Sequence, residues 1–271
     1  HIAAACKQKQ TQNNNNNRQN HKNNKNNYQG NSMKTALITG GAARIGAQIV
    51  KTLHHNQFNI IIHCNHSQNK AQLLCEELNS IRNNSAEIIS GDLKNIDELD
   101  ALVSSIKSLD LLVNNASIFY PKSVDNSELQ DWDDVLNINL RAPFFLSKGL
   151  SKTLSKNDGS IINIIDIHSE RPLKNYAIYN ISKAGLKMLT QTLAKELAPK
   201  IRVNGISPGS ILWPQDDAKI SVDEKNLMLE RIALHRQGSP DDIADTVLFL
   251  ANSNYITGQI INIDGGRTLN Q

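Results

Sequence analysis

The segment 35–50 reads TALITGGAARIGAQIV: an apolar run, a turn with glycines from Thr39 to Gly46, and the start of a helical pattern. Glycine in such a turn lets the backbone approach a phosphate, and the helix start adds unpaired amides and a partial positive charge. An ordinary tight turn is the alternative, but its place between a strand and a helix favours a site for the pyrophosphate of a dinucleotide. The expected contacts are Gly40, Arg44, Ile45 and Gly46.

Beyond this unit, short β-rich runs alternate with longer segments of helical period, as in a parallel sheet covered on both faces. The expected strands are 35–39, 59–64, 86–91, 109–114, 160–166, 201–207 and 259–263. The expected helices are 45–55, 68–81, 96–106, 133–155, 177–198, 222–233 and 241–251. We therefore expect an α/β fold of Rossmann type, with a doubly wound, seven-stranded parallel sheet in three α/β/α layers. The segment 209–227 departs from this pattern and is a candidate lid over a substrate.

The 271 residues suffice for one large α/β domain, a class that commonly reaches roughly 250 residues. Residues 1–32 differ from the rest, with eleven Asn, five Gln and little apolar surface. Such a segment cannot offset the entropy of its own ordering. We expect a disordered tail at 1–32 and a single dinucleotide-binding domain at 33–271.

Charge and cysteine content argue against several classes of protein. Residues 1–32 hold five of the 29 basic side chains and none of the 26 acidic ones. The rest of the chain therefore has a slight net negative charge, which argues against a surface that binds nucleic acid. Cys6, Cys64 and Cys75 have neither paired nor metal-ligand spacing, so we expect no disulfide and no metal site. No apolar run reaches the roughly twenty residues that span a bilayer, which predicts a cytoplasmic protein without membrane contact.

The lack of acidic side chains after the turn indicates the type of dinucleotide. A site for NAD normally has an Asp or Glu after the second strand to hold the ribose hydroxyls, but no acid precedes Glu76. The region instead holds donors that suit a 2′-phosphate, which favours NADPH over NAD. Ordinary solvated side chains are the alternative. The donors are Arg44, His63, Asn65, His66 and Ser67.

The ends of the third and fourth strands offer further contacts. Asp92, followed by Leu93, either accepts a hydrogen bond from the adenine amino group or caps the next helix. Asn115, followed by Ala116, lies where a side-chain amide can hold backbone and cofactor together, with an Asn-rich turn as the alternative. Both positions fall at the carboxyl edge of the sheet, where open α/β sheets bind ligands.

Tyr179 and Lys183 are four residues apart in a helical pattern and therefore project from one face. A phenol has an ordinary pKa near 10, and an adjacent ammonium lowers it by favouring the phenolate. The pair thus predicts a general acid for a group that receives hydride, with Lys183 lowering the pKa of Tyr179. Such a pair also arises by chance on solvated faces, but the dinucleotide turn earlier in the chain favours catalysis.

Together these motifs resemble the short-chain dehydrogenase/reductase family over Lys34 to Gln271. Further matches to the family pattern are Asn139, Pro208-Gly209 followed by Ser210, and Asp264-Gly265-Gly266. In most members a Ser thirteen residues before the Tyr polarises a carbonyl, whereas this chain has Asp166 there. An ionised carboxyl only accepts hydrogen bonds and repels a developing oxyanion, but it can relay a proton to a ring nitrogen.

Asp166, together with Arg44 in place of a usual Gly, resembles the pteridine reductase branch, which reduces C=N bonds of pterins and folates. The segment 114–121, NNASIFYP, is similar to a motif of that branch. The resemblance implies that Phe119 stacks a pterin and that Ser117 touches pterin or cofactor. The segment 63–67 also resembles the branch, with His66 where an Arg is frequent.

The resemblance implies hydride transfer from NADPH to a pterin ring carbon, while Tyr179 protonates the ring nitrogen. Asp166 would orient or reload Tyr179, Lys183 would hold the nicotinamide ribose, and Asn139 would support Lys183 through water. It also implies a homotetramer. The alternatives are a carbonyl reductase for 3-oxoacyl thioesters or small ketones, in which His168 or Ser169 replaces the missing Ser, and a non-catalytic NADPH-binding regulator.

Overall fold

One parallel sheet organises the computed structural model, which describes residues 33–212 and 221–269. The strands are β1 (Thr35–Ile38), β2 (Asn59–Cys64), β3 (Ala86–Ser90), β4 (Leu111–Asn114), β5 (Ser160–Ile164), β6 (Arg202–Pro208) and β7 (Ile260–Ile263). Their order in the sheet is β3-β2-β1-β4-β5-β6-β7, and every neighbouring pair is parallel. The predicted doubly wound, seven-stranded sheet is confirmed.

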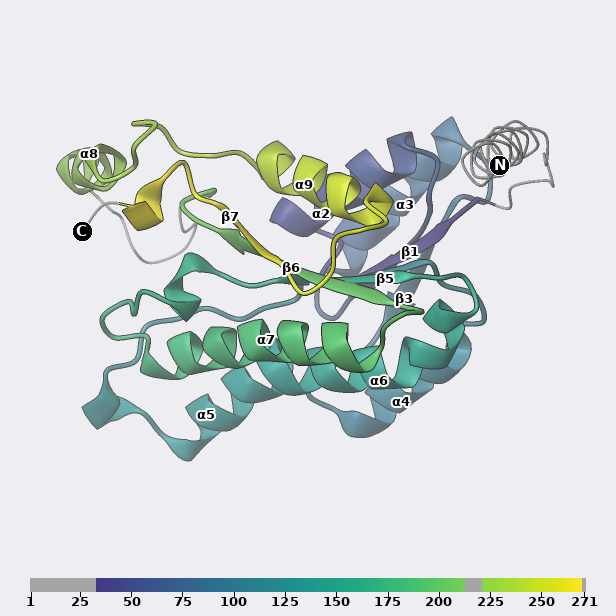
Figure 1. Cartoon of the computed structure of the whole chain (residues 1–271), viewed down its shortest axis with the longest axis horizontal. Coiled ribbons are helices and arrows are strands. Elements are labelled where there is room, and N and C mark those ends of the chain that lie inside the picture. Colours follow the sequence, from purple (N-terminus) through teal and green to yellow (C-terminus); the bar gives the residue numbers. More distant parts are fainter. Residues whose placement is uncertain (1–32, 213–220, 270–271) are drawn as a thin grey trace, which may run out of the picture. The chain divides into compact units, whose positions relative to one another are not determined.

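Helices cover both faces of this sheet (Figure 1). One layer holds α2 (Arg44–His55), α3 (Gln68–Ile81) and α9 (Pro240–Asn252). The other holds α4 (Ile96–Ser105), α6 (Ala142–Ser155) and α7 (Ala177–Glu196), with α5 (Leu129–Leu136) beside α7. The short helix α8 (Val222–Glu230) follows β6. The predicted three-layer arrangement is therefore confirmed.

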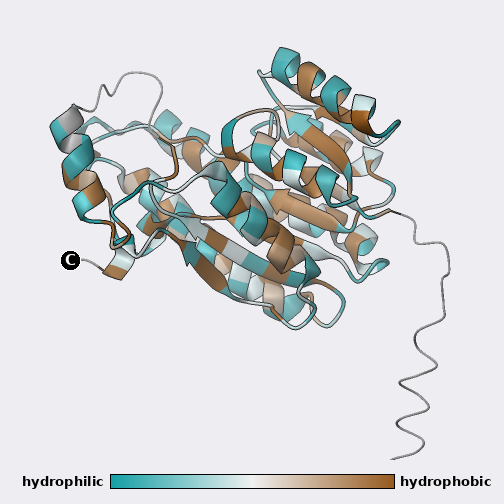
Figure 2. Cartoon of the chain, turned by 90° about the horizontal axis from the view of Figure 1, so that it is seen from above, coloured by the Kyte–Doolittle hydropathy of each residue, from teal (hydrophilic) through white to brown (hydrophobic). Residues whose placement is uncertain are grey.

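The strands alternate their side chains between two separate apolar cores. In β1, Ala36 and Ile38 pack with α2 and α9, whereas Leu37 between them packs with α4 and α6. All three side chains are fully buried, as expected for a strand covered on both faces. Figure 2 shows the result, with largely hydrophobic strands between helices that carry both hydrophobic and hydrophilic residues.

The predicted helix at 133–155 differs from the structure. The helical segment begins at Leu129, because the backbone N–H of Glu128 donates to the Asp131 carboxylate at 3.0 Å and so fixes the first turn. It then passes through a five-residue π-helical turn, Asn137–Arg141, before α6 begins. An inserted π turn rotates the residues on it relative to a regular helix, and such turns are frequent at functional sites.

Strand order reverses between β1 and β4, so the connections that follow these two neighbouring strands run in opposite directions and leave space for a ligand at their carboxyl ends. The predicted disordered tail at 1–32 lies outside the described residues, as does the part of the candidate lid at 213–220. Among the residues that are described, none of the helices is both long and apolar enough to cross a membrane.

Candidate active site

The glycine-bearing turn joins β1 to α2 at the carboxyl edge of the sheet. Gly40 has φ +62°, a left-handed conformation that glycine adopts without strain. A Cβ on Gly46 would lie 2.2 Å from the carbonyl oxygen of Gly40, so that only glycine allows the helix to start so close to the turn. Partly buried Ile45 lies in the first turn of α2.

The N-terminus of α2 has neither a side-chain cap nor an acidic residue in its first turn. Its amides and partial positive charge are therefore not compensated by the chain's own side chains, which fits the pyrophosphate of a dinucleotide. Arg44 is exposed and has φ +54°, an uncommon conformation for a residue with a side chain. Its guanidinium can thus approach a bound anion from solvent.

The end of β4 is tied to the same turn through Asn115. Its side-chain amide donates to the carbonyl oxygens of Thr39 at 2.9 Å and Gly40 at 3.2 Å. In return, the hydroxyl of Thr39 accepts from the backbone amides of Asn115 and Ala116 at 2.9 and 3.0 Å. Thr39 is a site residue without an expected role, although a hydroxyl at the start of a glycine-bearing turn is a signal for one.

The predicted 2′-phosphate donors divide into two groups in the structure. His66 is exposed and Asn65 and Ser67 are partly exposed at the end of β2. Ser67 precedes α3 without capping it, so its hydroxyl remains available for a ligand. His63 is instead buried, and both of its ring nitrogens bond to backbone groups of the fold. The expected phosphate contact of His63 is therefore wrong.

The end of β3 carries Asp92 at the edge of this site. Its Oδ1 accepts from the backbone amide of Lys94 at 2.9 Å, whereas the cap of α4 is the side chain of Asn95. The helix-cap alternative for Asp92 is thus wrong, and its contact with adenine stays a prediction. Leu93 is buried in the core between the sheet and α4.

The structure brings Asp166 and Tyr179 into direct contact. The hydroxyl of Tyr179 donates to Oδ2 of Asp166 at 2.7 Å. The other carboxylate oxygen, Oδ1, accepts from the backbone amide of His168 at 2.8 Å. Tyr179 lies on α7 and is 6% exposed, whereas Asp166 lies two residues after the end of β5 and is partly exposed. A carboxylate therefore contacts the phenol at the end of a central strand.

Lys183 is buried one turn beyond Tyr179 on α7 and donates from Nζ to the carbonyl oxygen of Ile164 at 3.1 Å. Nζ lies 5.6 Å from the centre of the Tyr179 ring, on its face. Burial lowers the pKa of Lys183 to about 8, although the field of Asp166 acts in the opposite direction. The amine is therefore placed to lose its charge more readily than an exposed lysine.

The pKa of Tyr179 is raised well above its ordinary value, first by burial and then by the charge and hydrogen bond of Asp166. The prediction that Lys183 lowers this pKa is thus wrong for this arrangement. The reason is geometric: the carboxylate contacts the hydroxyl itself, whereas the ammonium faces the ring. The phenol consequently holds its proton at neutral pH, and in this arrangement it is a weaker acid than an exposed tyrosine.

Asn139 lies on the π turn and binds the loop after β4. Its side chain accepts from the amide of Ile118 at 2.9 Å and donates to the carbonyl oxygen of the same residue at 3.1 Å. It also donates to the Ser182 hydroxyl, which in turn donates to the carbonyl oxygen of Tyr179. Asn139 thereby joins the loop to the catalytic helix, while its predicted water relay to Lys183 stays a prediction.

An aromatic cluster borders the catalytic phenol. The ring of Phe119 stacks on Tyr176 at a centroid distance of 4.4 Å and meets the edge of Tyr179 at 4.8 Å. Phe119 is 46% exposed, which leaves part of its surface open to a flat ligand, and Ser117 on the same loop is exposed. Tyr176 is not among the expected site residues, although its position three residues before Tyr179 is a signal for proximity.

The last part of the site lies at the end of β6. The amide of Gly209 donates to Ile263 at 2.9 Å, and a Cβ on Gly209 would lie 2.7 Å from the Cβ of Asp264. Pro208 is buried before it and Ser210 is partly buried after it. Their predicted cofactor contacts stay predictions. Among the residues that the structure describes, no group of three or more His, Cys, Asp or Glu side chains could hold a metal ion.

The fold and this site define a class of enzyme: an oxidoreductase that uses a nicotinamide dinucleotide. Residues 40–268 match the family model described as Enoyl-(Acyl carrier protein) reductase. A 3-oxoacyl-[acyl-carrier-protein] reductase FabG from Staphylococcus epidermidis is 37% identical over 242 residues, covering 86% of this chain and 98% of that protein. Pteridine reductase 1 from Leishmania tarentolae is 34% identical over 280 residues, covering 86% of this chain and 96% of that protein.

A further relative, a 3-oxoacyl-[acyl-carrier-protein] reductase FabG from Rickettsia bellii, is 36% identical over 239 residues, covering 87% of this chain and 97% of that protein. The match to the family model spans strands β2 to β7, the turn from Gly40 onward and the Tyr179–Lys183 pair. The chain belongs to the short-chain dehydrogenase/reductase family.

Proposed function

We propose that this oxidoreductase is an NADPH-dependent pteridine reductase, which reduces a C=N bond of a dihydropterin or dihydrofolate. The observation that carries the proposal is the 2.7 Å hydrogen bond from the Tyr179 hydroxyl to Asp166. Reduction of a carbonyl develops negative charge on oxygen, which a neighbouring carboxylate opposes. Reduction of a C=N bond leaves a basic nitrogen that takes a proton, and a phenol held by a carboxylate suits that step.

The chain's own residues account for the proton transfer. The raised pKa of Tyr179 keeps the phenol protonated at neutral pH until a more basic atom is presented to it. Once Tyr179 has given up its proton, a phenolate beside the carboxylate of Asp166 is unfavourable, so the pair takes up a proton again. The partial exposure of Asp166 provides a route to solvent for this reloading.

The cofactor preference follows from the groups around the turn. When bound, NADPH supplies the hydride. The uncapped start of α2 and the turn at Gly40 would hold the pyrophosphate, and Arg44, His66 and Ser67 would surround the 2′-phosphate. Lys183 would hold the nicotinamide ribose from the floor of the site.

The substrate class is supported by the exposed ring of Phe119 next to Tyr179. A flat heteroaromatic ring gains roughly 1 kcal/mol from stacking on such a surface, beyond the burial of its area. The similarity to Pteridine reductase 1 agrees with this assignment.

A second candidate is a carbonyl reductase for 3-oxoacyl thioesters, which the comparisons favour. Relatives with that name have identities of 36–37%, above the 34% of the pteridine reductase. In this alternative, His168 or Ser169 supplies the donor that Asp166 cannot. The Oγ of Ser169 is buried and makes no hydrogen bond within the described residues, so a hydroxyl is present on the relevant loop.

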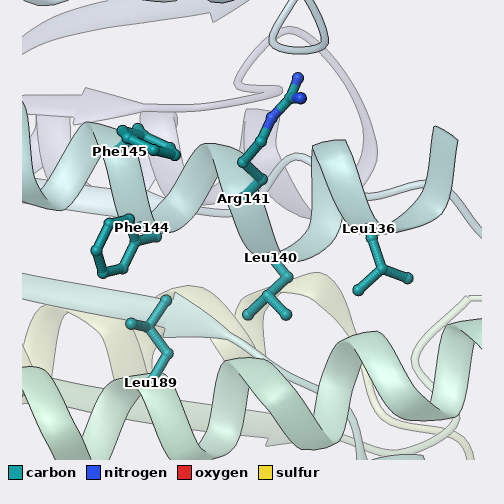
Figure 3. Close-up of a pocket in the computed structure, with 6 residues that line it drawn as sticks. All are labelled: Leu136, Leu140, Arg141, Phe144, Phe145 and Leu189. Carbon is teal, nitrogen blue, oxygen red and sulfur yellow. The ribbon is translucent and has the colours of Figure 1, made fainter. Parts of the chain in front are cut away.

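We also propose that the protein forms a homotetramer through the layer of α5, α6 and α7. Figure 3 shows Leu136, Leu140 and Phe144 on the side of their helical segment that faces α7, where Leu189 lies. Phe144 is 39% exposed and Met188 on α7 is 62% exposed. Exposed apolar surface of this kind commonly marks an interface, and sedimentation equilibrium would test it.

A panel of substrates distinguishes the candidates. NADPH oxidation should be followed with dihydrobiopterin, dihydromonapterin, dihydrofolate and acetoacetyl thioester, each with and without a diaminopteridine antifolate. We expect kcat/KM for at least one pterin or folate to exceed that for the thioester by about a hundredfold or more, because the site rejects a developing oxyanion. The antifolate should compete with the pterin.

Turnover of the thioester alone would contradict the pterin proposal and support the carbonyl reductase. Binding of NADPH without turnover of any substrate would indicate the non-catalytic regulator, against which the intact Tyr179 and Lys183 argue.

A further inference from the structure

The ring of His63 connects two segments of the cofactor site. His63 lies on β2 and is 2% exposed. Its Nδ1 accepts from the amide of Gly40 at 3.2 Å, and its Nε2 lies 3.1 Å from the carbonyl oxygen of Gly91. An amide can only donate and a carbonyl can only accept, so these two partners fix the neutral tautomer with its proton on Nε2.

The main chain around His63 repeats the same connections. The amide of Gly41 donates to the carbonyl oxygen of His63 at 2.9 Å, and the amide of Gly91 donates to Cys64 at 3.2 Å. The turn after β1 and the end of β3 are thus each bound twice to the end of β2. The two side-chain hydrogen bonds depend on the identity of residue 63, because only a side chain with an acceptor and a donor in these positions can make both.

We propose that His63 is a positioning residue for the dinucleotide, which sets the turn at Gly40 and the segment Gly91-Asp92 at the spacing that pyrophosphate and adenosine require. The inference rests on the use of a nicotinamide dinucleotide and is independent of the substrate. Gly40 holds its left-handed conformation within this network, so loss of the ring leaves a buried amide without its acceptor. The turn then relaxes away from the conformation that receives a phosphate.

The ring must stay neutral for this role. Burial lowers the pKa of His63, while the bond to Gly91 and the charge of Asp92, on the segment after β3, raise it to a lesser degree. Among the described residues, Asp92 is the charged group that acts on the ring; the turn after β1 faces it with backbone amides. Protonation would place an N–H on Nδ1 against the N–H of Gly40 and break that connection.

The test separates the two hydrogen bonds. His63→Asn keeps an acceptor at the place of Nδ1, His63→Gln keeps a donor at the place of Nε2, and His63→Leu removes both. We expect the Kd of NADPH, measured by fluorescence titration, to rise at least about tenfold in the Leu variant and about three- to tenfold in the other two. At saturating NADPH, kcat should stay within about threefold of the unmodified protein.

The matched control is His54→Leu. His54 is also 2% exposed and bonds through Nε2 to Ser85 at 2.7 Å, but Ser85 precedes β3, at the opposite edge of the sheet from the cofactor. Its loss should lower the melting temperature as His63→Leu does, with the Kd of NADPH unchanged. An unchanged Kd in all three His63 variants, or an equal rise in His54→Leu, would overturn the proposal.

Discussion

Asp166→Ser should reduce kcat for dihydropterin by about 10²- to 10³-fold while the Kd of NADPH stays unchanged. The substitution removes the carboxylate that accepts from the Tyr179 hydroxyl at 2.7 Å, and a positioned acid–base group contributes on the order of 10²- to 10⁴-fold. The cofactor turn is a separate part of the sheet edge and keeps its contacts. Steady-state NADPH oxidation and fluorescence titration measure the two quantities.

The same variant should gain turnover of acetoacetyl thioester, because a hydroxyl can donate to a developing oxyanion where a carboxylate cannot. Asp133→Ser, on the exposed side of α5, is the matched control and should leave both activities unchanged. Unaltered pterin kinetics in Asp166→Ser would remove the main support for the pteridine reductase proposal.

Lys183→Met should abolish turnover and yet make the protein more stable at pH 7. Burial lowers the pKa of this amine to about 8 from its ordinary 10.5, which corresponds to a cost of about 3 kcal/mol for holding the charged form in the fold. The variant loses the bond to Ile164, worth about 1 kcal/mol. A net gain of about 1 to 2 kcal/mol in the free energy of unfolding is expected from urea titrations.

The sign of this effect depends on pH. Between about pH 8 and 10.5 the unfolded lysine binds a proton that the folded one has lost, so stability of the unmodified protein rises across this window and the advantage of Met disappears. Lys187→Met, one turn further along α7 and paired with Glu170, is the control and should change stability by less than about 0.5 kcal/mol. If Lys183→Met were less stable than the unmodified protein at pH 7, burial of the charged amine would not destabilise the folded state, and this explanation would be contradicted.

Much of the fold could be predicted because the apolar pattern determines it directly. Strands such as β1 and β2 are nearly continuous apolar runs, and the alternation of Ala36, Leu37 and Ile38 between two cores follows from the strand period alone. The π turn at Asn137–Arg141 could not be predicted, because the nearby Pro143 indicates a disturbed helix but not the kind of turn or its position. That turn nevertheless positions Asn139 against the loop after β4.

The site could be predicted as a set of residues but not as a set of contacts. Spacing on one helix places Lys183 beside Tyr179, but it does not tell whether the ammonium faces the ring or the hydroxyl. The contact of Asp166 with the phenol depends on how β5 and α7 lie together, and it reverses the expected change in the pKa of Tyr179. The burial of His63 could not be predicted either, because its ring bonds to backbone groups of Gly40 and Gly91, which only the packing of the sheet brings near it.

The central claim is that Asp166 and Tyr179 deliver a proton as one unit. A double-mutant cycle of Asp166→Ser and Tyr179→Phe, read as kcat/KM for a dihydropterin, tests it most directly. We predict that the double variant is no slower than Tyr179→Phe alone, within about twofold, because the carboxylate acts only through the phenol. If Asp166→Ser slows the Tyr179→Phe protein by the same factor as it slows the unmodified one, the two residues act independently and the account is contradicted.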